Sequence, residues 1–307
     1  MRWPSIRNFV TRRPSTLRLA AHLDRGRGGM RWLDDYPVPP PASHVPDLKN
    51  WETRELSAIW IGHATVLLRI GGKTILTDPV FSNRIGLGLM LGTLGPRRRV
   101  APALLPRDLP KLDLILISHA HFDHLDRPSL GRLDKKTPVV TAPRTQDLIR
   151  DLGFRRITEL KWGQHVSFDD LTITAREVAH WGSRLILDKY RGFNAYLLQS
   201  AGHRILFGGD SAYQEFFTDL GGVDLAILGI GGYDPFIRNH ASPEQAWGMA
   251  NHAGAKYLLP IHHSTFRLSH EPVHEPIDRL IAAAGEKSDR IALRDVGETW
   301  TYDHAVS

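Results

Sequence analysis

The segment His119-Ala-His-Phe-Asp-His124 constrains this chain more than any other feature. It directly follows Leu114–Ile117, an apolar run with the length and composition of a buried strand. Side chains two apart on an extended segment point to the same side, so His119 and His121 share one face. A following turn can bring Asp123 and His124 back to the same point. The pattern therefore predicts a metal site at the exit of a buried strand.

The types of ligand available narrow the choice of metal. The chain has 307 residues, 16 of them histidine and none cysteine. Neither a thiolate site nor a disulfide can form, so histidine and carboxylate side chains must hold any metal. Such ligands favour zinc, with iron and manganese as alternatives. A lack of cysteine also fits a reducing compartment, and we expect a cytoplasmic protein.

Three further candidate ligands each follow a predicted strand: His180, Asp210 and His262. Short loops at strand ends hold ligands rigidly, and the Gly208-Gly209 pair lets the backbone before Asp210 approach the site. His263 is the alternative to His262. Neighbouring side chains of an extended segment point in opposite directions, so only one of the two should bind.

These residues suffice for two metal ions. Asp210 has the type and placement to bridge them. Metals about 3.5–4 Å apart would hold a hydroxide between them and make a nucleophile available at neutral pH. The two predicted groups of ligands are His119, His121 and His180, and Asp123, His124 and His262.

Two residues are candidates for catalytic roles. Asp123 is expected to act first as a metal ligand and second as a proton acceptor. His240 lies in a Gly-rich loop just before a predicted helix start at Ser242. The partial positive charge of a helix N-terminus would favour an anionic group there. His240 is a candidate substrate contact or general acid, and a hydrogen bond at the helix entry is the structural alternative.

Further polar residues are weaker candidates. His63 can line the site as a substrate contact, or donate a hydrogen bond to a carboxylate that supports the metal ligands from outside. Asp78 can orient a ligand histidine or cap a turn. The run of Arg97, Arg98 and Arg99 can meet phosphate groups, although such a run is more often a solvated face.

Two segments raise the question of a membrane. The apolar, Gly-rich run 85–94 precedes the arginines and would suit a lipid surface, with an ordinary buried segment as the alternative. Residues 1–50 form a basic, Pro-rich arm, with the rest of the chain, 51–307, as a single hydrolase domain. Apolar residues near positions 3–10 can lie on an anionic membrane, so peripheral contact with its inner face is possible, or the arm can pack on the domain.

Charge argues against a nucleic-acid partner. The net charge is +6, and residues 1–35 supply eight arginines against three aspartates, so the remaining body is nearly neutral. No apolar run approaches the ~20 residues of a membrane span. The sequence does not indicate an oligomeric state.

The order of predicted elements is strand-rich. The sequence predicts a hairpin at Gly71-Gly72 and strands such as 171–178 and 225–228. It predicts helices over 145–152, 242–252 and 276–284. Strands with interspersed helices make up two halves of similar composition. Such an order favours an α/β architecture of two packed sheets with helices outside.

Residues 55–270 resemble the metallo-β-lactamase superfamily through the His119–His124 motif with His180, Asp210 and His262. The resemblance implies a four-layer αββα sandwich with two zinc ions at the sheet edge. More particular stretches resemble the N-acylphosphatidylethanolamine-hydrolysing phospholipases D and their bacterial relatives. These are Trp60–Val66, Leu76–Ser82, Gly95–Arg99, Ser118–Asp126, Ala179–Trp181, His240–Ala246 and Pro260–Phe266.

The resemblance implies hydrolysis of a phospholipid phosphodiester, releasing phosphatidate and an N-acylethanolamine. A more distant likeness, to L-ascorbate-6-phosphate lactonases, makes a small soluble ester such as a sugar-phosphate lactone the alternative substrate. A nuclease is disfavoured by the nearly neutral body, and a β-lactam hydrolase by the phospholipase-like stretches. A non-enzymatic binding module would be expected to have lost ligands, and every ligand position here is filled.

Overall fold

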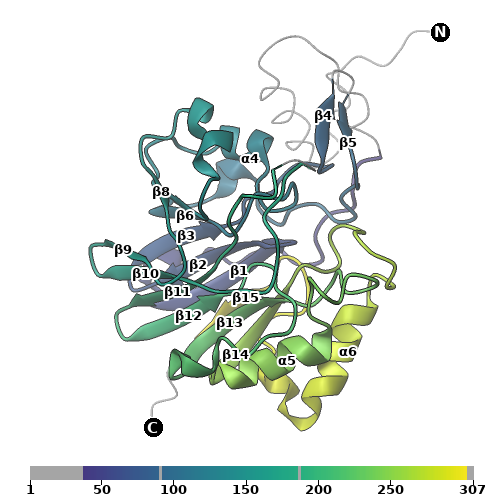
Figure 1. The fold of residues 1–307 in the computed structure, drawn as a ribbon. Coiled ribbons are helices and arrows are strands. Elements are labelled where there is room, and N and C mark those ends of the chain that lie inside the picture. The colour runs from purple at the N-terminus through teal and green to yellow at the C-terminus, as the bar shows by residue number, and fades with distance from the viewer. Residues whose placement is uncertain (1–36, 90–91, 186–187, 303–307) are drawn as a thin grey trace, which may run out of the picture.

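Two β-sheets pack face to face, with helical segments on both outer sides, and this confirms the predicted αββα sandwich (Figure 1). The computed structural model describes residues 37–89, 92–185 and 188–302. The apolar residues near positions 3–10, for which membrane contact was considered, therefore lie outside the described residues. Residues 37–50 pack on the body, where the Pro40 carbonyl accepts a hydrogen bond from the Ala101 amide at 2.7 Å.

The first sheet has seven strands in the order β15-β1-β2-β3-β6-β7-β8. The expected hairpin joins β2 to β3, and both glycines of its turn, Gly71 and Gly72, have positive φ, as a tight two-residue turn requires. The C-terminal strand β15 was not predicted, because its partner β1 lies about 240 positions earlier in the chain. The strands are β1 (Leu56–Gly62), β2 (Thr65–Ile70), β3 (Lys73–Thr77), β6 (Leu114–Ile117), β7 (Val139–Thr141), β8 (Ile157–Glu159) and β15 (Thr299–Thr301).

The second sheet has six strands in the order β14-β13-β12-β11-β10-β9. Strand β13 pairs in parallel with both neighbours and is buried along most of its length, which explains its nearly continuous apolar sequence. By contrast, β10 alternates buried and half-buried residues. The strands are β9 (His165–Phe168), β10 (Leu171–Arg176), β11 (Ala195–Ser200), β12 (His203–Phe207), β13 (Val223–Gly229) and β14 (Ala255–Ile261).

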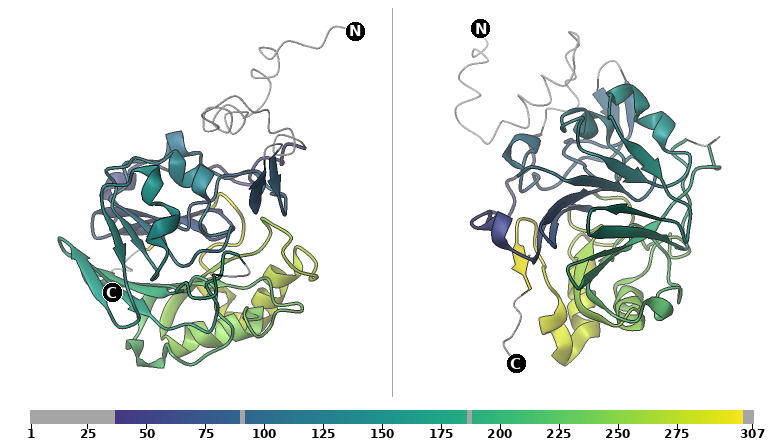
Figure 2. Two further views of the ribbon diagram at one scale, coloured as in Figure 1. Left: turned by 45° about the horizontal axis from the view of Figure 1, so that its top comes forward. Right: turned by 90° about the vertical axis from the view of Figure 1, so that its left-hand side faces the viewer.

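The main core lies between the two sheets and includes Trp60, Leu68 and Phe207, all fully buried. Helices α5 (Pro243–His252) and α6 (Glu275–Ala284) cover the outer face of the second sheet, as predicted (Figure 2). Ser242 caps α5 in a reciprocal capping box with Gln245.

The outer layer on the first sheet is thinner than predicted. It contains α4 (Arg127–Gly131) and short 3₁₀ turns. The prediction of a helix over 145–152 is wrong. Two 3₁₀ turns, Gln146–Leu148 and Arg150–Leu152, stand in its place. Arg127 donates to the Leu148 carbonyl, which an α-helix would need for its own ladder. Tertiary hydrogen bonding therefore overrides the local pattern. The remaining 3₁₀ turns are Trp51–Thr53, Pro106–Asp108, Thr218–Leu220 and Gly285–Arg290.

A separate hairpin of β4 (Leu87–Leu89) and β5 (Gly92–Leu94) stands clear of both sheets (Figures 1 and 2). Leu87, Leu89 and Leu94 are exposed, so the alternative of an ordinary buried segment for residues 85–94 is wrong at these positions. The tip, residues 90–91, is not among the described residues. None of the helices in the described part of the chain is long and apolar enough to cross a membrane.

Candidate metal centre

The predicted ligands converge at one edge of the sandwich, although they come from both sheets. His119 to His124 follow β6 of the first sheet. His180, Asp210 and His262 follow β10, β12 and β14 of the second. A very close approach of the two halves permits this, because a Cβ on Gly209 would lie 2.7 Å from the Cβ of Ser118. Gly209 also has a positive φ, so the site depends on glycine there.

Asp210 lies at the centre of the cluster. Its Oδ2 is 3.1 Å from Nε2 of His124 and 3.2 Å from Nε2 of His262. The same oxygen is 3.8 Å from Nε2 of His119 and 3.7 Å from Nε2 of His180. Its other oxygen, Oδ1, is buried with no hydrogen-bond partner in the described structure. This is the placement predicted for a bridging carboxylate.

The two groups of donors match the predicted division. In the first, Nδ1 of His121 lies 2.8 Å from Nε2 of His119 and 3.3 Å from Nε2 of His180. Within each group, with Asp210 counted in the first, the donor atoms lie within 4.8 Å of one another. Nitrogens and carboxylate oxygens that converge so closely offer lone pairs to one point, so the donor set fits two cations.

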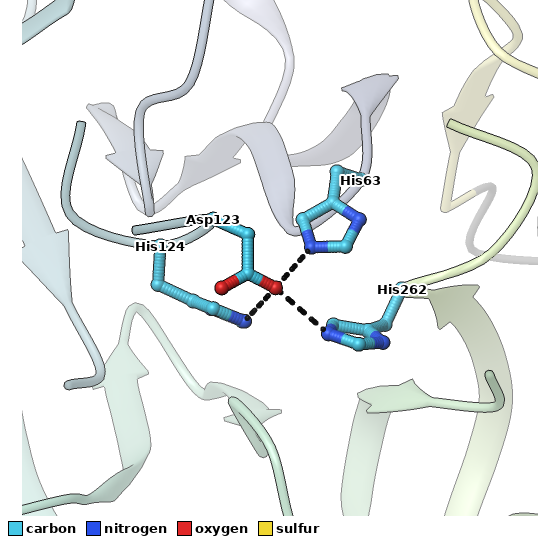
Figure 3. A group of neighbouring side chains, drawn as sticks. All are labelled: His63, Asp123, His124 and His262. Atoms are coloured by element: carbon cyan, nitrogen blue, oxygen red, sulfur yellow. Dashed lines mark hydrogen bonds and ion pairs between the residues drawn. The ribbon is translucent and has the colours of Figure 1, made fainter. Parts of the chain in front are cut away.

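The second group surrounds Asp123 (Figure 3). Its Oδ2 is 2.9 Å from Nε2 of His63, 3.2 Å from Nε2 of His262 and 3.6 Å from Nε2 of His124. His63 was expected to line the site or to donate to a carboxylate outside the ligand set; it does line the site, but the carboxylate that it contacts is Asp123, a predicted ligand. His263 lies elsewhere, with its ring centroid 4.5 Å from that of Trp60. The geometry thus favours His262 as the ligand.

A fixed oxygen partner orients each of the four histidines whose Nε2 faces Asp210. Nδ1 of His124 bonds Asp78 at 2.7 Å, and Nδ1 of His119 bonds the Ser118 hydroxyl at 2.9 Å. Nδ1 of His180 donates to the Asn239 carbonyl at 2.9 Å, and Nδ1 of His262 donates to the Gly231 carbonyl at 3.2 Å. A ring that donates through Nδ1 presents a bare Nε2 to a metal. The two carbonyls were not predicted, and only the Gly231-Gly232 pair hinted at one of them.

Backbone strain gathers at the same place. His63, Asp78 and His262 have φ of +55°, +32° and +65°, values that non-glycine residues rarely adopt. Such conformations persist where the surrounding structure fixes them, and they cluster at functional sites.

Pairing of protonated histidines with ionised carboxylates explains how the buried cluster is stable without a metal. Burial alone would raise the pKa values of Asp123 and Asp210, but the His124 charge and contacts with His262 hold both well below the usual range. Burial opposes protonation of His262, yet the Asp210 charge and the Asp123 hydrogen bond raise its pKa to about 10. The pKa of His124 is raised well above 6.5 for the same reason. A divalent cation would take over the role of these protons.

His240 lies at the open side of the cluster, with Nδ1 3.8 Å from Oδ2 of Asp210. Burial lowers its pKa to about 4, so the ring is neutral near pH 7. This favours a hydrogen-bonding role over proton donation. Its alternative role at the helix entry is not seen, because the capping hydrogen bonds of α5 come from Ser242 and Gln245.

Arg98 requires a correction. It was expected to meet substrate phosphate, but its side chain is buried. The guanidinium donates to the Val80 carbonyl at 2.6 Å and the Ser82 carbonyl at 3.0 Å, and lies 4.8 Å from the Phe266 ring centre. Arg98 therefore holds the loops behind the site, whereas Arg97 and Arg99 are exposed.

Asp78 provides a first test of the ligand geometry. We expect Asp78→Asn to weaken zinc binding about 10- to 100-fold. An amide oxygen can replace Oδ2, which accepts from His124 and the Ser118 hydroxyl, but the amide NH₂ would then face the Ser118 N–H that now donates to Oδ1 at 2.7 Å. Chelator competition on the purified protein measures this. Asp113→Asn, a change remote from the cluster, is the control. Equal zinc affinity of Asp78→Asn and wild type would contradict the orienting role.

Comparisons with known proteins agree with this geometry. A family model described as "Beta-lactamase superfamily domain" matches residues 73–263. An uncharacterised protein of Mycobacterium tuberculosis is 32% identical over an alignment of 271 positions that covers 84% of this chain and 72% of that protein. The N-acyl-phosphatidylethanolamine-hydrolyzing phospholipase D 1 of Caenorhabditis elegans is 29% identical over 80% of this chain and 75% of its own length.

A solved structure supports the fold. The isothiocyanate hydrolase from Delia radicum gut bacteria has a TM-score of 0.64 and covers 80% of this chain and 99% of its own. At 20% sequence identity, that likeness bears on the fold alone.

Proposed function

Because the chain belongs to the metallo-β-lactamase superfamily and is a metal-dependent hydrolase, we propose that it cleaves an N-acylphosphatidylethanolamine-type phospholipid in the manner of a phospholipase D. The observation that carries the proposal is the similarity to the nematode phospholipase over four-fifths of this chain, together with the two groups of metal donors. In the reaction, a water oxygen bonds to phosphorus and the P–O bond to the N-acylethanolamine breaks. The leaving oxygen takes up a proton.

Two zinc ions at the donor groups would activate water at neutral pH and neutralise charge on the phosphoryl oxygens. The protein orients the donors: Asp210 faces both groups, and Asp123 is fixed by His63. His240 lies at the open side, where its ring can contact substrate. The lowered pKa of Asp123 keeps the carboxylate ionised, as a metal ligand requires, but it also makes Asp123 a weak base, so its second role as proton acceptor stays a prediction.

The surroundings of the centre suit an amphiphilic anion. Beside His121 lies the Trp181 ring, at 4.7 Å between ring centroids. Trp181 lines an open cleft of about 680 Å³ together with Arg184, Leu185 and Lys189. The Arg184 guanidinium is held through Nη1 by the Ala120 and Leu125 carbonyls, so the exposed Lys189 is the cation that can meet a phosphate. Trp181 and Leu185 can contact the start of an acyl chain.

The proposal is tested by hydrolysis of N-acylphosphatidylethanolamine in mixed micelles by zinc-loaded protein, with products identified by mass spectrometry. We expect phosphatidate and N-acylethanolamine in equal amounts, and no turnover after chelation. An intact phosphodiester in the presence of fully metallated protein would contradict the lipid substrate. The search would then move to soluble phosphoesters and sugar-phosphate lactones.

We also propose that the β4–β5 hairpin contacts an anionic lipid surface. Leu87, Leu89 and Leu94 are 47%, 49% and 63% exposed. Arg97 and Arg99 are exposed, and residues 83–100 include no acidic residue, so the apolar surface is joined to positive charge. The hairpin base adjoins the site, because Arg98 pairs with Phe266, four residues after His262.

We expect the double change Leu87→Asp, Leu89→Asp to weaken binding to phosphatidylglycerol vesicles at least about 100-fold, since each leucine inserted into lipid contributes roughly 1.5 kcal/mol or more. Vesicle flotation measures the bound fraction. Val45→Asp, at another exposed apolar position, is the matched control. Flotation equal to wild type in the double variant would rule out the hairpin as the contact.

A further inference from the structure

A loop of glycines supports His262 from behind. Residues 231–234 follow β13, and His262 follows the neighbouring strand β14. The Gly231 carbonyl accepts from Nδ1 of His262 at 3.2 Å. A Cβ on Gly231 would lie 2.3 Å from the His262 carbonyl oxygen, and one on Gly232 would lie 3.1 Å from Nδ1 of His240. The loop therefore touches a predicted metal ligand and the predicted substrate contact at once.

The buried carboxylate of Glu271 holds this loop in place. Its Oε1 accepts from the Gly232 amide at 2.5 Å, and its Oε2 accepts from the Asp234 amide at 3.2 Å. The Ser269 hydroxyl donates to Oε1 at 2.5 Å and fixes the carboxylate in turn. A second tie, from the His270 amide to the Asp234 carbonyl at 2.9 Å, joins the same two segments.

We propose that Glu271 is a positioning residue that acts through the 231–234 loop on His262, and so sets the affinity of the metal position that His262 serves. The inference rests on the two-metal centre of the proposed function. In the described structure, the hydrogen bonds of Glu271 go to the backbone of the 231–234 loop and to Ser269, and not to the donor cluster or His240. Partners one step removed from a metal typically change affinity by 10- to 100-fold when altered.

The test is zinc binding by the full-length protein, measured by chelator competition for each bound equivalent. Glu271→Gln keeps the size of the side chain, but an amide can accept from only one of the two backbone N–H groups. We expect one zinc equivalent to bind about tenfold more weakly and the other to be unchanged. Cobalt substitution gives a second readout, as a changed absorption spectrum for the affected site only.

Asp278→Asn, an exposed change on α6, is the matched control and should bind both equivalents as wild type does. Equal weakening of both equivalents in Glu271→Gln, or no weakening of either, overturns the proposal. If Glu271→Gln does not fold, Ser269→Ala replaces it, and a smaller loss at one equivalent supports the proposal whereas unchanged binding overturns it. If the wild type binds a single zinc, the two-metal centre is wrong, and weakening of that site in Glu271→Gln still supports the role of Glu271.

Discussion

Alanine in place of Asp210 is expected to reduce hydrolysis at least about 10²- to 10³-fold, because a metal contributes several kcal/mol to the transition state and each 1.36 kcal/mol is tenfold. Asp210 is the one carboxylate within 4 Å of ligand nitrogens from both donor groups in the described structure. Its loss removes the bridge and leaves His124 and His262 without their main counter-charge. Metal content per chain, measured with activity, should fall below that of the wild type.

The fold itself should survive this change, since the core lies between the sheets and Asp210 is at their edge. Circular dichroism of Asp210→Ala should match the wild type. Asp170→Ala, on the far hairpin between β9 and β10, controls for loss of a carboxylate and should keep full activity. Full activity with two metals bound in Asp210→Ala would refute the bridging role.

The metal-free protein is expected to be most stable near neutral pH and to lose stability steeply in acid. Burial lowers the pKa of several histidines below the ordinary 6.5, so the folded state binds fewer protons than the unfolded state. Their contribution to the free energy of unfolding is present above pH 6.5. It is lost as the pH falls, by up to about 1.4 kcal/mol per pH unit for each histidine. The pKa values of His63 and His263 fall to about 3 and that of His240 to about 4, and those of His119, His121 and His180 are also lowered.

The opposite sign holds for His124 and His262, whose pKa values are raised. Their contribution to the free energy of unfolding is complete below pH 6.5 and is lost as the pH rises towards about 10. Thermal unfolding in chelator should show a midpoint that falls by at least about 10 °C between pH 6.5 and 5, and more gently on the alkaline side. Zinc-loaded protein melted alongside gives the size of the metal contribution. A midpoint that rises on acidification would contradict the burial of these rings.

The sequence predicts which candidate ligands converge in the structure, because the pattern that marks them is local. His119 to His124 follow one buried strand, and the other ligands follow strands that are themselves clear from apolar patterning. The types of residue that hold a metal are few, and cysteine is absent, so little ambiguity remains. Helix α5 is equally predictable, since Ser242 and Pro243 mark its start.

Other parts depend on contacts that no local pattern records. Burial of Arg98 follows from carbonyls of Val80 and Ser82 that turn inward, and neighbouring Arg97 has the same local pattern but is exposed. The 3₁₀ turns after Thr145 arise because Arg127 donates to the Leu148 carbonyl and Arg191 donates to the Arg144 carbonyl. An α-helix would use both carbonyls for its own hydrogen bonds. Strand β15 exists only through its pairing with β1. Each of these features is set by partners distant in the chain.

Neither half of the chain can make the metal centre alone. The donors up to His124 belong to the first sheet and those from His180 onward to the second, and β15 returns from the C-terminus to close the first sheet. Contacts of such long sequence separation form late in folding and slow it. Metal uptake should therefore follow docking of the sheets, and bound metal should act as a cross-link that slows their separation. Two fragments cut between residues 160 and 170 would then recover metal binding only as a pair.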